Sequence, residues 1–144
     1  MKVQFKKLSD RATIPSYANL GDSGLDLHPE TPFTLEPGER KLIKTGIAIE
    51  LPQGYEAQVR PRSGLALKYG VTVLNSPGTI DSSYRGDIGV ILINHGEEEF
   101  EYFGKAIAQL VIAPVTQVDL VEAQTSLTMT KRGEGGFGST DDSK

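Results

Sequence analysis

NSPGTIDSSYRGDIGVILIN, residues Asn75 to Asn94, is the stretch of sequence that predicts the fold. It opens with turn-forming residues, Asn75 to Gly78, and closes with Ile88–Ile93, which is apolar apart from one glycine and too short for a comfortable helix. A run of this kind is typical of a strand that is buried on both faces. The preceding Val71–Leu74 is short and β-branched, so we expect the two runs to pair.

The segment between these two runs carries more chemistry than a simple connector needs. Asp81, Tyr84, Arg85 and Asp87 lie within one short turn region. Loops on a rigid scaffold often carry function, so a carboxylate, a phenol and a guanidinium here indicate a ligand site at the mouth of a sheet. A solvated hairpin tip is the alternative interpretation, and this stretch alone leaves both open.

Composition favours a single folded domain rich in turns and strands. The chain has 144 residues, 38% hydrophobic, with 16 Gly and 8 Pro, and shows no long helical period. It contains no cysteine, which excludes disulfides and thiolate chemistry. A net charge of −4 argues against non-specific binding of nucleic acid. An anionic ligand would therefore need specific arginines or a metal to offset its charge.

The N-terminal residues do not resemble a signal segment, and the sequence contains no membrane-like run. Met1–Lys7 lacks an apolar signal core, and no apolar run approaches membrane-spanning length. We expect a soluble, cytoplasmic protein without a membrane or nucleic-acid partner.

Short strand-like stretches follow one another along the chain. They are Lys2–Leu8, Ile47–Leu51, Tyr55–Arg60, Phe100–Phe103, Ala106–Val115 and Val118–Val121. Gly64–Lys68 predicts one helical turn with Ser63 as its N-cap, and Asn19–Pro29 predicts a loop. Many short strands with one short helix predict an all-β jelly roll or distorted β-barrel.

The C-terminal segment Thr130–Lys144 is rich in Gly, Ser and charge, and predicts a flexible arm. Gly133–Gly138 formally matches a dinucleotide fingerprint and Gly133–Thr140 a phosphate loop. We reject both matches, because no βαβ unit surrounds them and Ser139 occupies the position of the required lysine. Two interpretations remain: a disordered tail, or glycine amides that meet an anion, aided by side chains of Arg132, Ser139 and Thr140, with Phe137 stacked on a flat ring.

Other polar positions each allow two interpretations. Arg62-Ser63-Gly64 at the start of the helical turn could bind an anion, or Ser63 could only cap the helix. Gln109 and Asp26 stand among apolar residues, so each is either a satisfied structural group or part of a site. His28 and His95 are expected in surface or turn roles. The sequence lacks zinc-like ligand spacing, so a metal here would be a hard cation such as Mg²⁺.

These pieces, in this order, resemble the trimeric dUTPase family. The resemblance rests on Gly24–Leu27, Pro61–Val71, Asn75–Gly86, Gly104–Val111 and Arg132–Thr140, which together extend over nearly the whole chain. It implies a jelly-roll homotrimer that shares three active sites between subunits. It also implies a body of residues 1–131 and an arm of residues 132–144 that closes over a neighbour's site. Members hydrolyse dUTP to dUMP and pyrophosphate with Mg²⁺, which keeps uracil out of DNA and supplies dUMP for thymidylate synthesis.

The resemblance also implies roles for the residues of the central segment. Asp81 corresponds to the catalytic carboxylate that orients and deprotonates the attacking water. Tyr84 corresponds to the ring beneath the deoxyribose that leaves no room for a 2′-hydroxyl. Asn75 and the backbone of Gly78, Thr79 and Ile80 correspond to the hairpin that reads the uracil edge and excludes the methyl group of thymine, with Gly89 beside the uracil pocket.

Further positions correspond to groups on the phosphate side of the substrate. In the body these are Arg62, Ser63, Gly64 and Gln109. Asp26 corresponds to an acidic residue near the water shell of the metal. In the arm, Arg132, Gly138, Ser139 and Thr140 would hold the γ-phosphate. Phe137, also in the arm, would stack on the base.

The chain departs from the family pattern at several positions without losing a proposed catalytic group. Many members have Asp where Ser83 stands, Glu at Asp87, a larger residue at Gly89, an Asp-Arg pair at Lys105-Ala106, and Gly at Asp141. The change at Lys105-Ala106 puts family salt bridges near it in doubt.

Two alternatives remain beside the hydrolase. A dCTP deaminase shares the fold but has a different arginine–serine motif from Pro61–Gly64. A nucleotide-binding protein without catalysis would lack the catalytic set.

Overall fold

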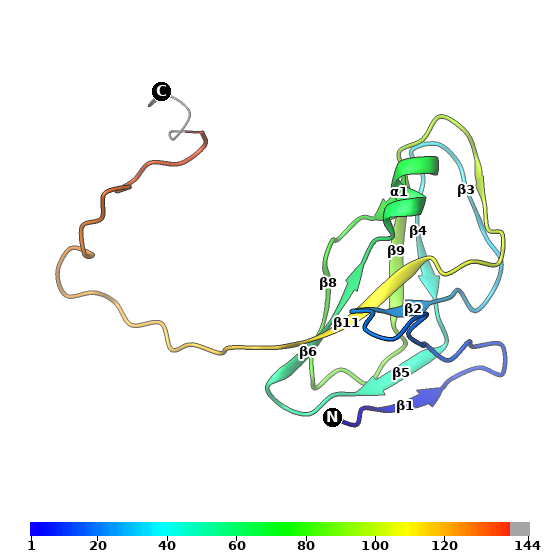
Figure 1. The fold of residues 1–144 in the computed structure, drawn as a ribbon, viewed down its shortest axis with the longest axis horizontal. Helices are drawn as coiled ribbons and strands as arrows, with labels where there is room; N and C mark the ends of the chain where they lie inside the picture. Colours follow the sequence, from blue (N-terminus) through cyan, green and yellow to red (C-terminus); the bar gives the residue numbers. More distant parts are fainter. Residues whose placement is uncertain (139–144) are drawn as a thin grey trace.

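A computed structural model describes residues 1–138, and its body is built of β-strands with one short helix (Figure 1). In chain order these elements are β1 Gln4–Lys7, β2 Leu25–Leu27, β3 Thr34–Leu35, β4 Arg40–Lys44, β5 Ile47–Glu50, β6 Tyr55–Arg60, α1 Ser63–Tyr69, β7 Val71–Val73, β8 Gly78–Ile80, β9 Gly89–Asn94, β10 Phe100–Glu101 and β11 Ala108–Pro114. The predicted fold class is confirmed.

The strands form open antiparallel sheets that do not close into a barrel, as in a distorted jelly roll. One sheet has the order β2-β11-β6-β8 and another the order β4-β9-β7. Two short ribbons, β1-β5 and β10-β3, complete the described body. The apolar side chains that these sheets enclose form one core, which includes Leu27, Ile47, Val71, Val90 and Leu92.

The predicted pairing of Val71–Leu74 with the run after Ile88 is confirmed, since β7 pairs antiparallel with β9. The prediction that this run is buried on both faces is only half right. Along β9, Val90, Leu92 and Asn94 are buried, whereas the residues between them are only partly covered. The alternation arises because one face of the β4-β9-β7 sheet meets the core and the other faces outward.

The polar segment between β7 and β9 contains a strand of its own. β8 pairs with β6, which belongs to the other large sheet: Ala57 lies opposite Ile80 and Val59 opposite Gly78. The chain therefore crosses from one sheet to the other and back within this segment. Asp81 to Asp87 lie on the return path between the two sheets.

Two local predictions were wrong. Leu25–Leu27, expected in a loop, is strand β2, because its backbone pairs with β11 at the sheet edge. Helix α1 has Arg62 as its N-cap and no capping bond from a side chain, so Ser63 is not the N-cap. Gly70 ends this helix as expected for glycine, with a φ of 68° and its N–H bonded to the carbonyl of Ala66.

A third local prediction was also wrong: the strand expected at Val118–Val121 is not formed. Among residues 1–138, the last hydrogen bond from the C-terminal part of the chain to the body joins the Val115 N–H to the Gly54 carbonyl, at 2.8 Å. Beyond it, residues 116–138 extend away from the sheets as an exposed segment, the end of which includes the described part of the expected arm, residues 132–138 (Figure 1). A β-strand needs a partner strand, and within the described chain none lies beside this segment. No described helix has the length and apolar character that crossing a membrane requires.

Replacing Asn94 with Ala should destabilise the fold by about 2 kcal/mol, because several buried backbone groups would lose their partners. The fully buried Asn94 side chain donates to the carbonyls of Leu35 at 2.9 Å and Glu98 at 2.8 Å, and accepts from the Gly96 N–H at 2.8 Å. Urea unfolding at fixed protein concentration measures the loss. Exposed His95→Ala is the control, with an expected change within about 0.5 kcal/mol. Equal midpoints for Asn94→Ala and the parent would contradict this role.

Candidate active site

A pocket of about 400 Å³ opens between the two large sheets. Strand β8 and the turn after it form one wall, and β4 and β9 form the other. Its lining residues are Leu42, Lys44, Thr79, Ile80, Asp81, Tyr84, Asp87, Gly89 and Ile91. The fold thus brings five of the expected site residues, Thr79, Ile80, Asp81, Tyr84 and Gly89, to one cavity.

The turn after β8 fixes Asp81 and Tyr84 relative to each other. The Tyr84 N–H donates to the Asp81 carbonyl at 3.0 Å, and the Tyr84 hydroxyl donates to the Asp87 carbonyl at 3.0 Å. Gly86 cannot carry a side chain here without moving the phenol, because a Cβ would overlap the Tyr84 hydroxyl. The turn therefore holds an exposed carboxylate and an aromatic ring at the pocket mouth.

Asp87 anchors the far end of this turn to the corner between β4 and β5. Its Oδ1 accepts a hydrogen bond from the Gly46 N–H at 2.9 Å. The neighbouring Thr45 hydroxyl donates to the Ile88 carbonyl at 2.8 Å and is buried. These contacts tie the start of β9 to the body, so the turn is held at both ends.

Arg85 braces the middle of the turn. Its guanidinium donates to the Ser82 carbonyl at 2.6 Å and pairs with the Glu50 carboxylate of β5 at 3.3 Å. The pair is more than half exposed, so its contribution to stability is small.

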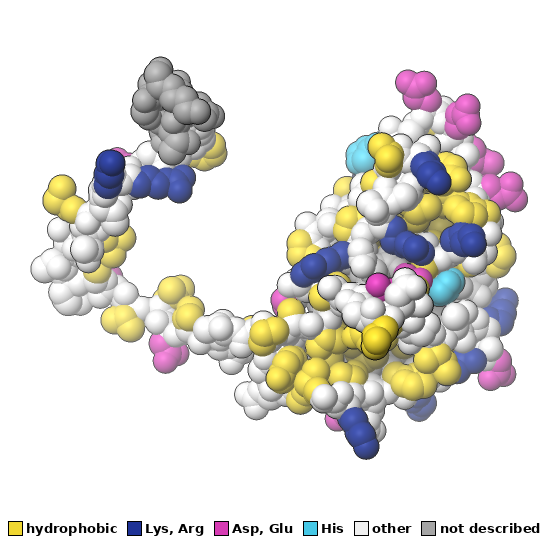
Figure 2. Space-filling view, viewed as in Figure 1, with side chains coloured by type: hydrophobic (Ala, Val, Ile, Leu, Met, Phe, Trp, Pro, Cys, Tyr) yellow, Lys and Arg dark blue, Asp and Glu magenta, His cyan; other side chains and the backbone are white. Residues whose placement is uncertain are grey.

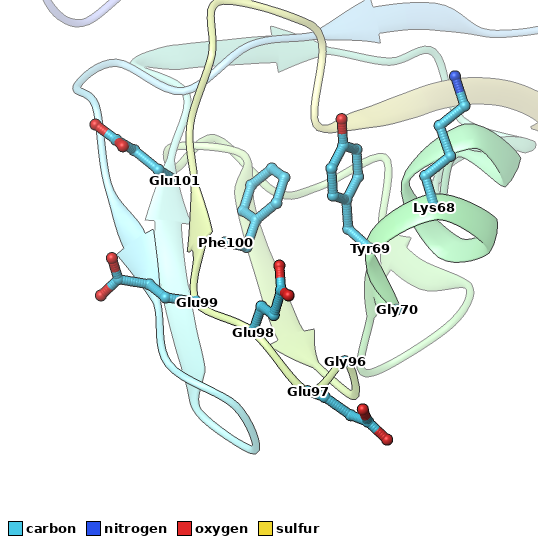
Figure 3. A pocket seen from close by; sticks show the side chains of 9 residues that line it. All are labelled: Lys68, Tyr69, Gly70, Gly96, Glu97, Glu98, Glu99, Phe100 and Glu101. Atoms are coloured by element: carbon cyan, nitrogen blue, oxygen red, sulfur yellow. The ribbon is translucent and has the colours of Figure 1, made fainter.

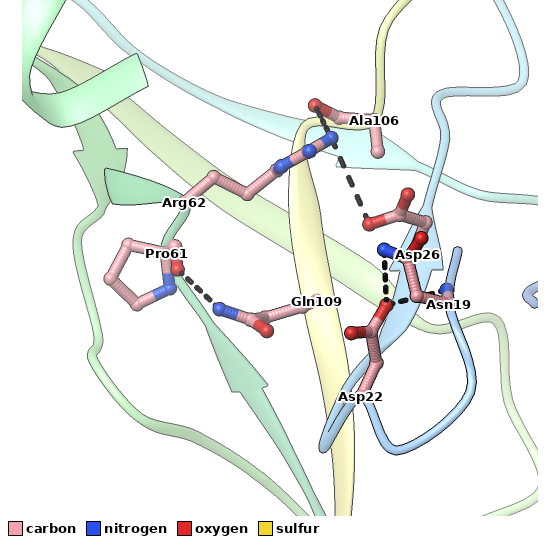
Figure 4. Close-up of polar contacts among 7 residues, drawn as sticks. All are labelled: Asn19, Asp22, Asp26, Pro61, Arg62, Ala106 and Gln109. Carbon is pink, nitrogen blue, oxygen red and sulfur yellow. Dashed lines mark hydrogen bonds and ion pairs between the residues drawn. The ribbon is translucent and has the colours of Figure 1, made fainter. Parts of the chain in front are cut away.

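A second group of expected residues gathers at the other end of the β2-β11-β6-β8 sheet (Figure 4). Arg62 Nη1 lies 3.7 Å from Asp26 Oδ1 and donates to the Ala106 carbonyl at 3.0 Å. Gln109 lies opposite Asp26 in the sheet and donates to the Pro61 carbonyl at 3.1 Å. Gly24 leaves room for this amide, since a Cβ there would lie 2.5 Å from Gln109 Oε1. Asp26 and Gln109 are therefore structurally engaged and still partly exposed.

The two groups lie apart on one chain. Gln109 is opposite Arg60 on β6, while Ile80 is opposite Ala57 on the other side of β6. Standard strand spacings place Gln109 and Ile80 about 14 Å apart. A small molecule bound in the pocket could contact the second group only through a part that extends well beyond the pocket.

The remaining expected residues join neither group through a described contact. Ser63 and Gly64 are exposed in the first turn of α1, and the amide of Asn75 lies against Gly78. Arg132, Phe137 and Gly138 are in the arm, away from the body (Figure 1). Ser139 and Thr140 fall outside the described residues.

A separate hollow of about 490 Å³ beside α1 contains none of the expected residues (Figure 3). Tyr69 and Phe100 line it, together with the acidic run Glu97–Glu99 and Glu101. The hydrogen bond between Glu99 and the carboxyl of Glu36, and the repulsion between the two, raise the pKa of Glu99 above its ordinary value. A site with this charge would repel an anionic ligand.

Comparison with known proteins gives one answer. Residues 10–141 match the family model dUTPase. The deoxyuridine 5′-triphosphate nucleotidohydrolase of Nautilia profundicola is 56% identical over 141 residues, which cover 97% of this chain and 99% of that protein. The one from Hydrogenobaculum sp. is 59% identical over 142 residues, covering 97% and 98%.

The chain belongs to the dUTPase family.

Solved structures of dUTPases share the fold. The Staphylococcus bacteriophage 80alpha dUTPase with dUpNHpp superposes with a TM-score of 0.85 at 29% identity, covering 96% of this chain and 97% of that one. A mutant dUTPase from phage phi11 of S. aureus, described with a structural Mg(II) ion, superposes with a TM-score of 0.81 at 24% identity, covering 89% and 100%.

On the wall of the pocket that comes from β4 and β9, the sequence indicated only Gly89. Leu42, Lys44 and Ile91 line the pocket but lie outside the stretches that carry the family resemblance. The only sequence signal for them is strand alternation, which places Leu42 and Lys44 on one face of β4 without indicating what that face meets.

Replacing Asp87 with Ala should lower the free energy of unfolding by about 1–3 kcal/mol, because the N–H of the buried Gly46 would lose its acceptor. Urea unfolding at fixed protein concentration measures the change. Asp87→Asn keeps an acceptor oxygen and is the matched control, with a smaller expected loss. If both variants unfold like the parent, the anchoring contact contributes nothing.

Proposed function

We propose that this protein hydrolyses dUTP to dUMP and pyrophosphate in a Mg²⁺-dependent reaction. Membership of the dUTPase family and the names of its relatives support the activity. The observation on this chain that carries the proposal is the placement of Asp81 and Tyr84 in one braced turn at the mouth of the pocket. We expect the enzyme to act in the cytoplasm, where it would limit uracil incorporation into DNA and supply dUMP.

The pocket fits a pyrimidine with its sugar at the mouth. The backbone of Gly78, Thr79 and Ile80, with the nearby Asn75, would bind the hydrogen-bonding edge of uracil. Tyr84 would pack beneath the deoxyribose. Its hydroxyl is already bonded to the Asp87 carbonyl, which restrains the ring and leaves it no easy movement to admit a 2′-hydroxyl.

Asp81 would act as the general base. Its carboxylate is exposed beside the pocket, where it can accept a proton from a water molecule directed at phosphorus. The water oxygen bonds to the α-phosphorus as the bond between the α-phosphorus and the oxygen that bridges to the β-phosphate breaks. Pyrophosphate leaves with the electron pair of that bond, and the abstracted proton passes from Asp81 to solvent.

The donor set of the chain suits a magnesium ion held mainly by the substrate. Within residues 1–138, no cluster of three His, Cys, Asp or Glu side chains could cage a metal. Mg²⁺ commonly keeps several waters and binds one or two carboxylates together with substrate phosphates. Asp26 is partly exposed, and its carboxylate would contact such an ion through a water molecule. When bound, the ion would offset negative charge on the triphosphate.

A homotrimer would bring the two separated groups of site residues together. Arg62, Ser63, Gly64 and Gln109 would then serve the phosphates of a nucleotide whose base lies in the pocket of a neighbouring subunit. Exposed apolar side chains support assembly, since a single chain leaves Met1, Phe5, Ile14 and Tyr17 around an apolar groove (Figure 2). Apolar surface of this extent commonly marks a protein–protein contact.

The arm would close over a bound nucleotide. Arg132 carries a positive charge, and Phe137 is fully exposed with a φ of 48°. An exposed ring on a glycine-rich segment can stack on a base at little steric cost. In this proposal, Gly138, Ser139 and Thr140 join Arg132 at the γ-phosphate.

The purified protein should release pyrophosphate from dUTP with Mg²⁺, and far less from UTP, dTTP or dCTP. Asp81→Asn should lower kcat by about 10²–10⁴-fold and leave nucleotide binding largely intact, because it removes the base but keeps the size of the side chain. Exposed Asp10→Asn is the control and should match the parent. A pyrophosphate-release assay with and without Mg²⁺ measures all four substrates. Equal use of UTP, or full turnover by Asp81→Asn, would refute the assignment.

Truncation before Arg132 should spare folding and assembly but reduce dUTP hydrolysis by at least about tenfold, since the closing donors and ring are lost. Far-ultraviolet circular dichroism and sedimentation check the fold and the assembly, and the same assay checks turnover. Phe137→Ala in the full chain separates loss of stacking from loss of the whole arm. Normal turnover by the truncated protein would show that the arm is not a lid.

A further inference from the structure

The hollow beside α1 contains aromatic surface that the fold leaves half uncovered. Tyr69 and Phe100 line the hollow, and Phe103 packs on both of them. The ring centroid of Tyr69 lies 5.4 Å from that of Phe100 and 5.7 Å from that of Phe103. Phe100 is buried, whereas Tyr69 is 43% and Phe103 is 49% exposed. Two exposed rings supported by a buried one present a flat surface to a ligand.

Carboxylates surround these rings. Glu97–Glu99 and Glu101 line the same hollow, and Lys68 is the one basic residue in its lining. Figure 3 shows Glu98 pointing toward the two rings that line the hollow, whereas Lys68 extends away from the glutamates. The hollow therefore combines aromatic surface with an excess of negative charge.

The negative charge in this hollow is only partly offset within the chain. Glu99 shares a hydrogen bond with the carboxyl of Glu36, between β3 and β4, and repulsion from that carboxyl raises the pKa of Glu99 above its ordinary value. Lys41 is nearby, but it is paired with Glu39 at 3.0 Å and donates to the Thr34 carbonyl at 2.8 Å. A cation bound in the hollow would relieve the repulsion between the two carboxyls.

The loop that carries the glutamates is held in place from two sides. On the side of α1, the His95 N–H donates to the Gly70 carbonyl at 2.9 Å, and a Cβ on Gly70 would lie 2.6 Å from the Gly96 nitrogen. On the other side, the Asn94 side chain binds the Gly96 N–H and the Glu98 carbonyl, each at 2.8 Å. A preformed site of this kind loses little conformational entropy when a ligand binds.

A metal ion is not the ligand that this arrangement suits. Within residues 1–138, no group of three His, Cys, Asp or Glu side chains is placed to hold a metal ion. The hollow of about 490 Å³ has room for an organic side chain with its adjoining backbone. Aromatic rings beside carboxylates favour a cation that is itself flat, because such a cation can stack and donate hydrogen bonds at once.

We propose that this hollow is a docking surface for an arginine-bearing segment of a partner protein. The planar guanidinium would stack on the exposed faces of Tyr69 and Phe103, and its N–H groups would donate to the glutamates beside them. The hollow shares no lining residue with the pocket that contains Asp81, so the inference does not depend on the proposed hydrolysis.

Titration of the full chain with short peptides tests the proposal. The probe is acetyl-Gly-Arg-Arg-Gly-amide, and the same peptide with citrulline at both arginine positions keeps the shape but lacks the charge. The arginine peptide should shift the nitrogen-15 NMR signals of Gly70 and residues 96–101, and the citrulline peptide should bind about tenfold more weakly or worse. A lysine peptide should bind about threefold more weakly, because an ammonium cannot stack as a plane. Equal binding of the arginine and citrulline peptides, or shifts confined to other residues, would overturn the proposal.

Substitutions in the hollow locate the binding. Glu97→Gln combined with Glu98→Gln should raise the Kd of the arginine peptide about fivefold or more, and Tyr69→Leu about threefold. Asp119→Asn combined with Glu122→Gln removes the same charge from the exposed segment after β11 and is the matched control, with a Kd within about twofold of the parent. An equal loss of affinity in the control would indicate attraction to net charge alone and would refute a specific site.

Two further measurements separate this surface from the nucleotide site and from the arm. The double glutamine variant should release pyrophosphate from dUTP at the parental rate. If the parent binds the peptide without hydrolysing dUTP, the proposed function fails and the docking surface stands. Truncation before Lys131 removes the basic pair Lys131-Arg132 and should leave the affinity for the peptide unchanged. A gain of about fivefold or more would show that the arm itself occupies the hollow, and would overturn the assignment to a partner protein.

Discussion

The pairing of β8 with β6 is the constraint on which the rest of the site depends. β7 and β9 are adjacent strands of one sheet, and a tight turn could have joined them. The connecting segment instead gives three residues to the other large sheet before it returns. This crossing separates the two sheet edges and creates the pocket, with Asp81 and Tyr84 on the return path.

The return path needs its own restraints, because a turn between two sheets has few backbone partners. The Asp87 carboxylate accepts the Gly46 N–H, the Tyr84 hydroxyl meets the Asp87 carbonyl, and Arg85 reaches back to Glu50. Most of these contacts join side chains to backbone, which costs less conformational freedom than a pair of long side chains. The proposed base and the proposed sugar platform are positioned by the same small set of hydrogen bonds.

Charge is distributed in a way that suits a polyanionic substrate on an acidic protein. The net charge is −4, and the acidic run Glu97–Glu99 with Glu101 lines a separate hollow beside α1 (Figure 3). Arg62 lies with Asp26 at the far end of the β2-β11-β6-β8 sheet, and Arg132 is in the arm. Neither arginine lines the pocket between the two large sheets of its own chain, which is why assembly is part of the proposed function.

The sequence by itself determined the fold class, the buried runs around Val71 and Val90, and the family, because hydrophobic periodicity and long motifs are local properties of the chain. It also indicated Asp81 and Tyr84 as chemistry-bearing residues. It could not determine that Leu25–Leu27 pairs with β11, that β8 leaves its neighbours for β6, or that Tyr69 packs against Phe100. Each of these contacts joins residues that are distant in sequence, and backbone pairing and side-chain packing choose their partners only when the whole chain is folded. For the same reason the strand expected at Val118–Val121 is absent: an apolar pattern gives a segment the capacity to pair, and only tertiary structure supplies the partner.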